Sequence, residues 1–454
     1  MAMRLFLYFQ ALFFLCISFF NAKPIEPQAV IGLSEGWAGN TVNTVIFRHH
    51  GIVTFGGYQF TAFYRDTANI ILIQRELQTD KWHADTLKGN YRIGDAHNSI
   101  SLGIDKKGYI HIAYDHHGHS LRYQVSDIPL NISEWGKPKP MTGLRETTVT
   151  YPAFVMNPMD STLMFLYRDG GATNGQACMK IYDTDSETWS DMPNCILSGR
   201  NQKPWSSNPY WNHPAFDGMG KMHLSYVWRT RSVTKNEMSL INNIGIDYIA
   251  TSDNGKSWLT VHGITATLPI TQVNSETVWA VPVGANLINQ TSMAVDGHGN
   301  PHIAYYANDE NGITQYQHLW YDGKKWNNTV VSNRKNVFNL SGGGTLQIPF
   351  SRPEIVIDRK DIVHIILRAD FTNDKMSVLT LYPPNYEFDE ANIKVLWNEP
   401  LGYAEPIIDR TRWAKDNILS MLIQYNHQPD GDRDVEKSVS PIYIVDWDLS
   451  SVCK

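Results

Sequence analysis

The segments GIDKKGYIHIAY (103–114), AFDGMGKMHLSY (215–226), AVDGHGNPHIAY (294–305) and VIDRKDIVHIIL (356–367) align with one another without gaps. In each, an apolar residue precedes an Asp, and a His follows six positions after that Asp within an alternating apolar stretch. This pattern predicts a strand, a tight turn and a second strand, in which the Asp carboxylate accepts hydrogen bonds from the turn backbone. A motif repeated with one fixed interval indicates that the chain is built from repeated units.

Three other stretches have the same two-strand shape with a different turn: 58–77, 151–170 and 405–425. Together with the aligned segments they divide the chain into seven units, which begin near residues 58, 97, 151, 212, 291, 352 and 403. Seven units of short strands are typical of an all-β protein with the seven-bladed β-propeller fold. We expect its ring to close by pairing of 440–449 with 28–36. A two-domain β-sandwich is the alternative, which the fixed Asp-to-His interval disfavours.

The composition is that of a folded protein with a large core. The chain has 454 residues, of which 42% are hydrophobic and 19% charged, and it contains 14 Trp, 22 Tyr and 17 Phe. Its net charge of −6 and the lack of a basic run argue against nucleic acid as a partner. An anionic polymer could still bind, but only at a local cluster of Arg, Lys and His.

The first residues, MAMRLFLYFQALFFLCISFFNAKP, combine one early Arg with a long apolar run that ends in small residues. This is typical of a secretory signal peptide, so we expect cleavage of residues 1–22 and a single secreted domain over 23–454. A retained N-terminal anchor is the alternative. No later stretch is long and apolar enough to span a bilayer, and we expect an extracellular monomer without a membrane partner.

Three cysteines remain after such a cleavage: Cys178, Cys195 and Cys453. In an oxidising compartment, Cys178 and Cys195 could close a hairpin with a disulfide. No group of Cys and His has the spacing of zinc ligands, so we expect no metal and no other cofactor. Four sequons would allow N-glycosylation in a eukaryotic host, and they begin at Asn131, Asn289, Asn327 and Asn339.

The histidines fall into two groups. Four of them occupy the same position of the repeat, and we interpret them as parts of the blade architecture: His111, His223, His302 and His364. By contrast, His97 precedes the first strand of its blade, while His116 and His117 follow the second strand. Since a hairpin brings the start of its first strand beside the end of its second, these three should lie at one mouth of the propeller. A cluster of imidazoles there is suited to proton transfer.

The next two blades direct further polar side chains to the same mouth. In one, Tyr151 begins the first strand and Arg168 ends the second. In the other, the first strand contributes Tyr210, Trp211 and His213, and the second strand ends at Arg229. With the histidines, these residues predict a cationic and aromatic pocket that suits a carboxylated sugar.

The chain resembles a known family in a set of short motifs, which are HNS (97–99), DHHGHSLRY (115–123), TYPAF (150–154), YRDGG (167–171) and NPYWNH (208–213). Their order and spacing are similar to those of the BNR-repeat propeller group that contains ulvan lyases, and the likeness is sharpest over 94–230. Those seven-bladed lyases cut a sulfated polysaccharide of rhamnose and uronic acid. The resemblance therefore implies a secreted lyase that cleaves an anionic polysaccharide by β-elimination.

Carried over by position, the resemblance implies catalytic roles for His97, His117, Tyr151 and Arg168, of which Arg168 offsets the charge of the uronate carboxylate. Contacts to the substrate are expected from His116, Tyr210, Trp211, His213 and Arg229. Tyr151 could serve as both base and acid if Arg168 and His117 lower the pKa of its phenol. Alternatively, one imidazole is the base and the other is the acid.

Two other functions stay open on this scaffold. A glycoside hydrolase acting on rhamnose–glucuronate linkages needs two carboxylates, and Asp95, Asp115 and Asp169 lie near the expected pocket. A propeller lectin would bind an acidic glycan without cleaving it. An unsaturated uronate product distinguishes the lyase from both.

Overall fold

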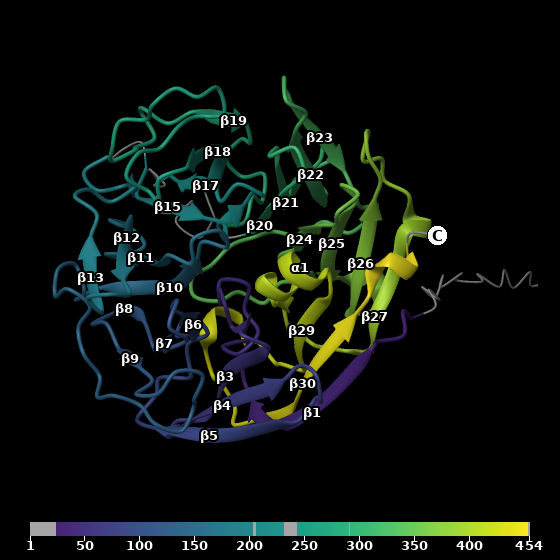
Figure 1. The fold of residues 1–454 in the computed structure, drawn as a ribbon. Coiled ribbons are helices and arrows are strands. Elements are labelled where there is room, and N and C mark those ends of the chain that lie inside the picture. Colours follow the sequence, from purple (N-terminus) through teal and green to yellow (C-terminus); the bar gives the residue numbers. More distant parts are fainter. Residues whose placement is uncertain (1–23, 203–205, 231–242, 290, 453–454) are drawn as a thin grey trace, which may run out of the picture.

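The structure is a computed structural model that describes residues 24–452 apart from 203–205, 231–242 and 290. Its strands form seven sheets arranged in a ring (Figure 1), which confirms the predicted seven-bladed β-propeller. The predicted signal peptide (1–22) and Cys453 lie outside the described residues. Within the described residues, no helix has the length and apolar character needed to cross a membrane.

The first four blades are made of antiparallel strands that follow one another in the chain. Blade one contains β2 (Ile52–Phe55), β3 (Tyr58–Asp66), β4 (Asn69–Glu76) and β5 (Trp82–Lys88). Blade two contains β6 (Ser101–Ile104), β7 (Ile110–Ala113) and β9 (Tyr123–Val125). Blade three contains β10 (Val149–Met156), β11 (Leu163–Asp169), β12 (Gln176–Asp183) and β13 (Thr188–Asp191), with β8 (His117–His119) and β14 (Leu197–Ser198) beside them. Blade four contains β15 (Asn208–Trp211), β16 (Ala215–Phe216), β17 (Met222–Arg229), β18 (Asn243–Thr251) and β19 (Thr277–Trp279).

The last three blades complete the ring. Blade five contains β20 (Ser292–Val295), β21 (Pro301–Asn308), β22 (Thr314–Tyr321) and β23 (Trp326–Val330). Blade six contains β24 (Glu354–Ile357), β25 (Val363–Arg368), β26 (Lys375–Leu381) and β27 (Ile393–Pro400). Blade seven contains β28 (Ile407–Ile408), β29 (Leu419–Gln424) and β30 (Val439–Trp447), and its outer strand is β1 (Ala29–Trp37). One α-helix and four 3-10 segments occur among the described residues: α1 (Arg410–Asp416), η1 (Asp370–Thr372), η2 (Glu390–Asn392), η3 (Asp430–Asp432) and η4 (Leu449–Val452).

The two ends of the chain close the ring in blade seven. The N-terminal strand β1 pairs antiparallel with β30, and the register places Ala29 opposite Asp446 and Trp37 opposite Val439. Figure 1 shows this purple strand beside the yellow C-terminal one. The expected pairing of 440–449 with 28–36 is therefore confirmed.

Blade one begins earlier than the sequence pattern predicts. Residues 58–77 are predicted to hold its first two strands, but they form the second and third, because β2 comes before them. The turn between β2 and β3 uses Gly56 and Gly57, whose φ values of 59° and 85° favour glycine. Since β2 has only four residues, it shows too little alternation to be recognised in the sequence.

The Asp and His of the repeat hold each hairpin together. Oδ1 of Asp105 accepts hydrogen bonds from the backbone N–H groups of Lys107 and Tyr109 at 2.9 and 3.0 Å. The second oxygen of Asp105 lies 3.5 Å from Nε2 of His111, whose Nδ1 lies 2.7 Å from the hydroxyl of Tyr123 on β9. The same Asp–His contact recurs at 3.6, 3.7 and 4.0 Å in the other three copies. These histidines are scaffold residues, as predicted.

A disulfide joins Cys178 to Cys195, as expected from the sequence. Cys178 lies on β12 in blade three, and both half-cystines are buried. The cross-link therefore ties the outer part of that blade together.

Candidate active site

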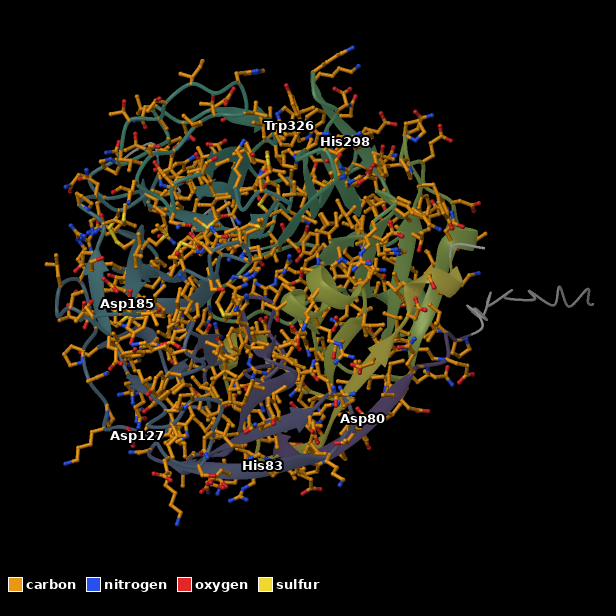
Figure 2. All side chains as sticks on the ribbon, viewed as in Figure 1. Asp80, His83, Asp127, Asp185, His298 and Trp326 are labelled. Atoms are coloured by element: carbon orange, nitrogen blue, oxygen red, sulfur yellow. A yellow bond between two sulfur atoms is a disulfide. The ribbon has the colours of Figure 1, made fainter. Side chains whose placement is uncertain are left out.

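A cavity of about 250 Å³ opens at the mouth of the propeller. Its lining side chains come from all seven blades, and most of them lie just before a first strand or at the end of a second strand. The sequence predicted this position from the geometry of the hairpins. The exposed residues His83 and His298, by contrast, lie at the outer edge of the ring (Figure 2).

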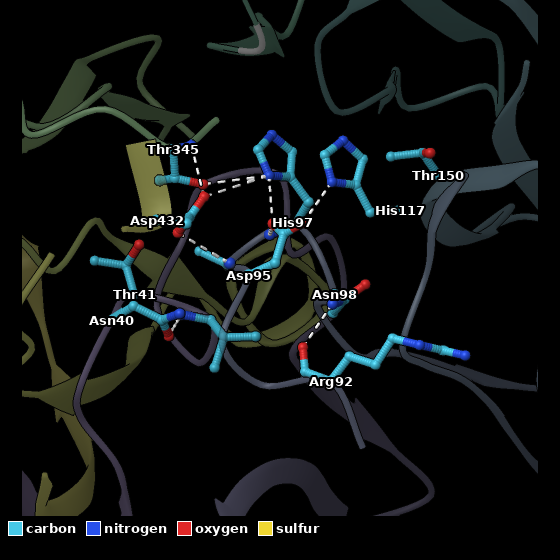
Figure 3. Close-up of polar contacts among 12 residues, drawn as sticks. Asn40, Thr41, Arg92, Asp95, His97, Asn98, His117, Thr150, Thr345 and Asp432 are labelled. Atoms are coloured by element: carbon cyan, nitrogen blue, oxygen red, sulfur yellow. Dashed lines mark hydrogen bonds and ion pairs between the residues drawn. The ribbon is translucent and has the colours of Figure 1, made fainter. Parts of the chain in front are cut away.

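His97 and His117 stand side by side at one wall of the cavity (Figure 3). Their rings are inclined by only 12°, with centroids 4.1 Å apart, and Phe47 also stacks on His97 at 5.1 Å. Nδ1 of His97 lies 2.7 Å from one carboxylate oxygen of Asp95, and Nδ1 of His117 lies 2.5 Å from the other. Each Nδ1 therefore carries the proton and donates it, so that Nε2 of each ring is left as a proton acceptor.

Local backbone contacts set the positions of these two rings. The backbone N–H of His97 donates to Oδ1 of Asp95 at 2.9 Å, which fixes the turn that carries both residues. His117 lies on β8, which pairs with β10 of blade three through Thr150. The two histidines are thus brought together from the loop before blade two and from a strand bound to blade three.

The electrostatics favour an ionised Asp95 and a neutral His97. Burial favours the neutral carboxyl, but hydrogen bonds from His117 and His97 outweigh it and hold the pKa of Asp95 well below its usual range. Burial lowers the pKa of His97, against the hydrogen bond to Asp95 and with help from the neighbouring His117. Two stacked imidazoles also repel one another when both are charged. At neutral pH His97, which lines the cavity, therefore has an unprotonated Nε2.

Tyr151 and Tyr210 form the adjoining wall, with ring centroids 6.1 Å apart and an edge-to-face arrangement. Tyr151 has a φ of 55°, which is uncommon for a residue with a large side chain. It lies at a β-bulge of β10, where the register with β11 shifts between Thr150 and Ala153. Such irregularities occur next to functional sites, where they re-aim a side chain.

The two phenols have opposite pKa shifts. Burial and the neighbouring Tyr210 raise the pKa of Tyr151 to about 12, despite the nearby arginines. Burial acts in the same direction on Tyr210, but the charges of Arg229 and Arg168 outweigh it, and the pKa of Tyr210 is lowered. The prediction that Arg168 and His117 could lower the pKa of the Tyr151 phenol is therefore wrong. Tyr151 keeps its proton at neutral pH and is suited to donate it.

Two guanidinium groups lie over these tyrosines. Arg168 is 4.9 Å from the ring centroid of Tyr151, and Arg229 is 4.5 Å from that of Tyr210. Arg168 donates to the carbonyl of Gly170 and to the hydroxyl of Thr150, both at 3.2 Å. Neither arginine has a carboxylate within ion-pair distance among the described residues. Because an unpaired guanidinium is costly to desolvate, this arrangement indicates a site for an anion.

Six of the predicted residues line the cavity together: His97, His117, Tyr151, Arg168, Tyr210 and Arg229. The other three do not line it, and we do not carry His116, Trp211 and His213 forward as ligand contacts. Successive residues of an extended chain point to opposite sides, so the neighbours of His117 and Tyr210 point away from the cavity.

Each of these three side chains has a structural role. Nε2 of His116 accepts a hydrogen bond from the backbone N–H of Arg122 at 2.7 Å. Trp211 is fully buried and meets Tyr151 edge-on, with ring centroids 6.3 Å apart. His213 is buried against two further histidines, His49 and His50, at 4.6 and 5.0 Å between ring centroids.

Several residues of the site were not found from the sequence. Asp95 was considered only as a carboxylate for a hydrolase, although its place two residues before His97 suits it to bond that ring. Arg352 and Glu405 form a buried ion pair at the cavity wall, with N–O distances of 2.8 and 2.6 Å. Thr345, from the long connection between β23 and β24, places its hydroxyl 3.3 Å from Nδ1 of His97. These residues lie in connections without alternation, which carry no pattern to recognise.

Asp95, His97 and His117 are also the one group among the described residues whose ligand atoms are close enough to hold a metal ion, within 4.8 Å of one another. The two Nδ1 atoms and the carboxylate oxygens already bond to one another. A metal at these atoms would have to displace both shared protons. The arrangement fits a carboxylate that orients two proton acceptors.

Residues 58–334, more than half of the chain, match the profile that describes a BNR repeat-containing family member. The chain belongs to the BNR repeat-containing family. An ulvan lyase of Alteromonas sp. (strain LOR) is 22% identical to this BNR repeat-containing protein over 341 residues, which cover 67% of this chain and 69% of that one. An "Ulvan Lyase-PL25" of Pseudoalteromonas sp. (strain PLSV) is 22% identical over 340 residues, with coverage of 67% and 68%.

Solved structures share the fold of this BNR repeat-containing protein. The structure of a polysaccharide lyase described as PL25-ulvan lyase superposes with a TM-score of 0.64 at 14% identity, covering 93% of this chain and 98% of that one. A structure of such a lyase bound to -[GlcA(1-4)Rha3S]- gives a TM-score of 0.63, also at 14% identity, with coverage of 93% and 99%. These superpositions show that the propeller extends over nearly the whole length of both chains.

Proposed function

We propose that this protein is a secreted polysaccharide lyase that cleaves a uronate-containing polysaccharide by β-elimination. The observation that carries the proposal is a pair of guanidinium groups, Arg168 and Arg229, that have no carboxylate partner among the described residues and lie beside the imidazole pair held by Asp95. The relatives named ulvan lyase support this reaction class and a polymer of uronate and sulfated rhamnose as substrate.

The first requirement of β-elimination is to stabilise the charge that develops next to the uronate carboxylate. In this reaction the proton on C5 leaves, the bond from C4 to the glycosidic oxygen breaks, and a double bond forms between C4 and C5. Arg168 serves the carboxylate, because a guanidinium stays charged and can bind a carboxylate through two parallel hydrogen bonds. Its burial strengthens this electrostatic contribution.

The second requirement is a base for the C5 proton and an acid for the leaving oxygen. Nε2 of the imidazole pair accepts the C5 proton, since Asp95 keeps the proton of each ring on Nδ1. Tyr151 donates its proton to the leaving glycosidic oxygen. The reaction ends with one imidazolium and one phenolate. Because the ring centroids of His97 and Tyr151 lie 5.9 Å apart, a return of the proton between these groups restores the starting state.

A hydrolase is disfavoured by the carboxylates that the structure places near the cavity. Asp115 is buried and paired with Arg92 and Arg122, and Asp169 is paired with Arg200. Neither of these carboxylates lines the cavity. A pair of free carboxylates, as hydrolysis of a glycoside requires, is therefore missing from the lining among the described residues.

The test is to follow the ultraviolet absorbance of an unsaturated uronate and, in parallel, the number of reducing ends. The substrates are a polymer of sulfated rhamnose and glucuronate and a panel of other uronate polymers. A lyase raises both signals in equal molar amounts. Reducing ends without absorbance would identify a hydrolase, and binding without either signal would identify a lectin. Either result would overturn the proposal.

A further inference from the structure

The guanidinium of Arg229 is held by the side-chain amides of two asparagines, where a carboxylate partner would be usual. Its Nε donates to Oδ1 of Asn243 at 3.2 Å, and its Nη2 donates to Oδ1 of Asn289 at 2.9 Å. Both asparagines are buried, and Nδ2 of Asn243 donates to the carbonyl of Leu287 at 2.9 Å, which fixes the orientation of that amide. The two amides therefore orient the guanidinium as carboxylates would, but they leave its charge uncompensated.

Two other buried arginines of the propeller, Arg352 and Arg48, have different hydrogen-bond partners. Arg352, at the same cavity, forms a bidentate ion pair with Glu405. Arg48 has no carboxylate partner among the described residues either, but four of its five N–H groups donate to backbone carbonyls. Arg229 has only the two amide oxygens among the described residues, and it lines the cavity. Its remaining N–H groups are therefore available to a ligand.

The two uncompensated arginines lie at different distances from the proton-transfer groups. Arg168 lies on Tyr151, whose ring is 5.9 Å from that of His97. Arg229 lies on Tyr210, whose ring centroid is a further 6.1 Å from that of Tyr151. The carboxylate of the reacting uronate must lie near the base. Arg168 is the arginine nearer to the base, so we assign this carboxylate to Arg168. Arg229 is then left for a second anionic group.

We propose that Arg229, held by Asn243 and Asn289, binds a second anionic substituent on the sugar next to the reacting uronate. The inference rests on the proposed lyase function and deepens it, since it requires a polymer with charges on two adjacent sugars. A sulfate ester and a second carboxylate share the chemistry that would be recognised, because each presents several oxygens to a planar set of donors.

The test uses Asn289→Asp and Asn243→Asp, which keep the shape of each side chain but add the missing carboxylate. Asn286→Asp is the matched control, because Asn286 is also buried and donates to Thr314 and to the carbonyl of Phe338, and it has no arginine partner in the part of the chain that the structure describes. On the sulfated rhamnose–glucuronate polymer, we expect kcat/KM to fall about tenfold to a hundredfold in the first two variants. The control should stay close to the wild type.

The polymers identify the second anion. If it is a sulfate, the desulfated polymer is cleaved less well by the wild type, and Asn289→Asp has no further effect on it. If it is a carboxylate, the loss in Asn289→Asp appears instead on a homopolymer of uronate and not on the sulfated polymer, whose rhamnose carries no carboxylate. An Asn289→Asp variant that cleaves all three polymers as the wild type does, or that is impaired equally on all three, would overturn the inference.

A binding measurement keeps this inference separate from the proposed reaction. Inorganic sulfate, compared with chloride at equal ionic strength, should raise the Tm of the wild type more than that of Asn289→Asp. If the wild type forms no unsaturated uronate but this difference is present, the lyase assignment fails and the anion site stands. If elimination occurs and sulfate stabilises both proteins equally, the second anion site is wrong.

Discussion

His97 and His117 share the two oxygens of one carboxylate, that of Asp95, while their rings stack with centroids 4.1 Å apart. Such sharing fixes both rings in one tautomer, with both Nε2 atoms free of the carboxylate. It also limits the pair to a single positive charge in practice, because two imidazolium rings at this distance repel strongly. The pair at the cavity wall therefore offers two Nε2 atoms as proton acceptors.

Replacement of Asp95 by Asn should abolish this arrangement. An amide offers one acceptor oxygen instead of two, so one imidazole must change its tautomer or lose its partner. We expect kcat to fall by about 10²–10⁴ while the protein stays folded. Asp105→Asn is the matched control, because Asp105 also contacts a histidine, His111, but only within a hairpin. It should lower stability without changing kcat of the folded protein, and an Asp95→Asn variant with wild-type kcat would contradict the account.

The pH dependence of turnover follows from the same groups. Nε2 must be unprotonated to accept the C5 proton, and burial lowers the pKa of His97 below its usual range. Activity should therefore be lost as the pH falls through the lowered pKa of His97 and reach a plateau at neutral pH. The pKa of Tyr151, about 12, keeps the acid protonated across the plateau. A profile of kcat/KM against pH that falls between neutral and mildly alkaline pH would argue against Tyr151 as the acid.

The two tyrosines should differ in their effects on turnover. Tyr151→Phe removes the proton donor, and we expect kcat to fall by about 10²–10⁴. Tyr210→Phe leaves both proton-transfer groups in place, so its main effect should be on KM. Steady-state kinetics of the two variants on one polymer make the comparison. A kcat loss confined to Tyr210→Phe would reverse the assignment of the acid.

Sequence reasoning found the fold and one part of the site, for a physical reason. The fixed interval between Asp105 and His111, and its three repeats, follows from hydrogen bonds within single hairpins, and local contacts leave a pattern in the sequence. The hairpin of β6 and β7 also leaves His97 and His117 at the same mouth, where pairing of β8 with β10 and the bond to Asp95 fix the position of His117. Along a strand, side chains alternate between the two sides, so only one of Tyr210 and Trp211 faces the cavity. The sequence alone does not show which of the two it is, and in the structure it is Tyr210.

The rest of the site depends on contacts between distant parts of the chain. Glu405 of blade seven pairs with Arg352 of blade six, and Asn289 of blade five holds Arg229 of blade four. These residues lie in connections between blades, where the spacing reflects no regular structure. Asn289 also begins one of the four N-glycosylation sequons, but the sequence does not show that its side chain is buried at the cavity, where no glycan could be accommodated.

The disulfide should matter for stability rather than for turnover. Cys178 and Cys195 are 17 residues apart and do not line the cavity. Loss of a cross-link over a loop of this size should lower the free energy of unfolding by about 2–4 kcal/mol. Urea denaturation of a Cys178→Ser, Cys195→Ser double variant gives the stability, and kcat of the folded variant should match that of the wild type. A large loss of kcat in the folded variant would indicate that blade three moves when the disulfide is absent.

The most direct test of the central claim is the rate of formation of unsaturated uronate by the wild type and by Arg168→Ala. Arg200→Ala is the control, since Arg200 lies near the site but pairs with Asp169. We predict that the wild type and the control form the unsaturated product from the uronate polymer, while Arg168→Ala is slower by about 10²–10³-fold with an unchanged Tm. Elimination by Arg168→Ala at the wild-type rate, or no unsaturated product from the wild type on any uronate polymer, would contradict the account.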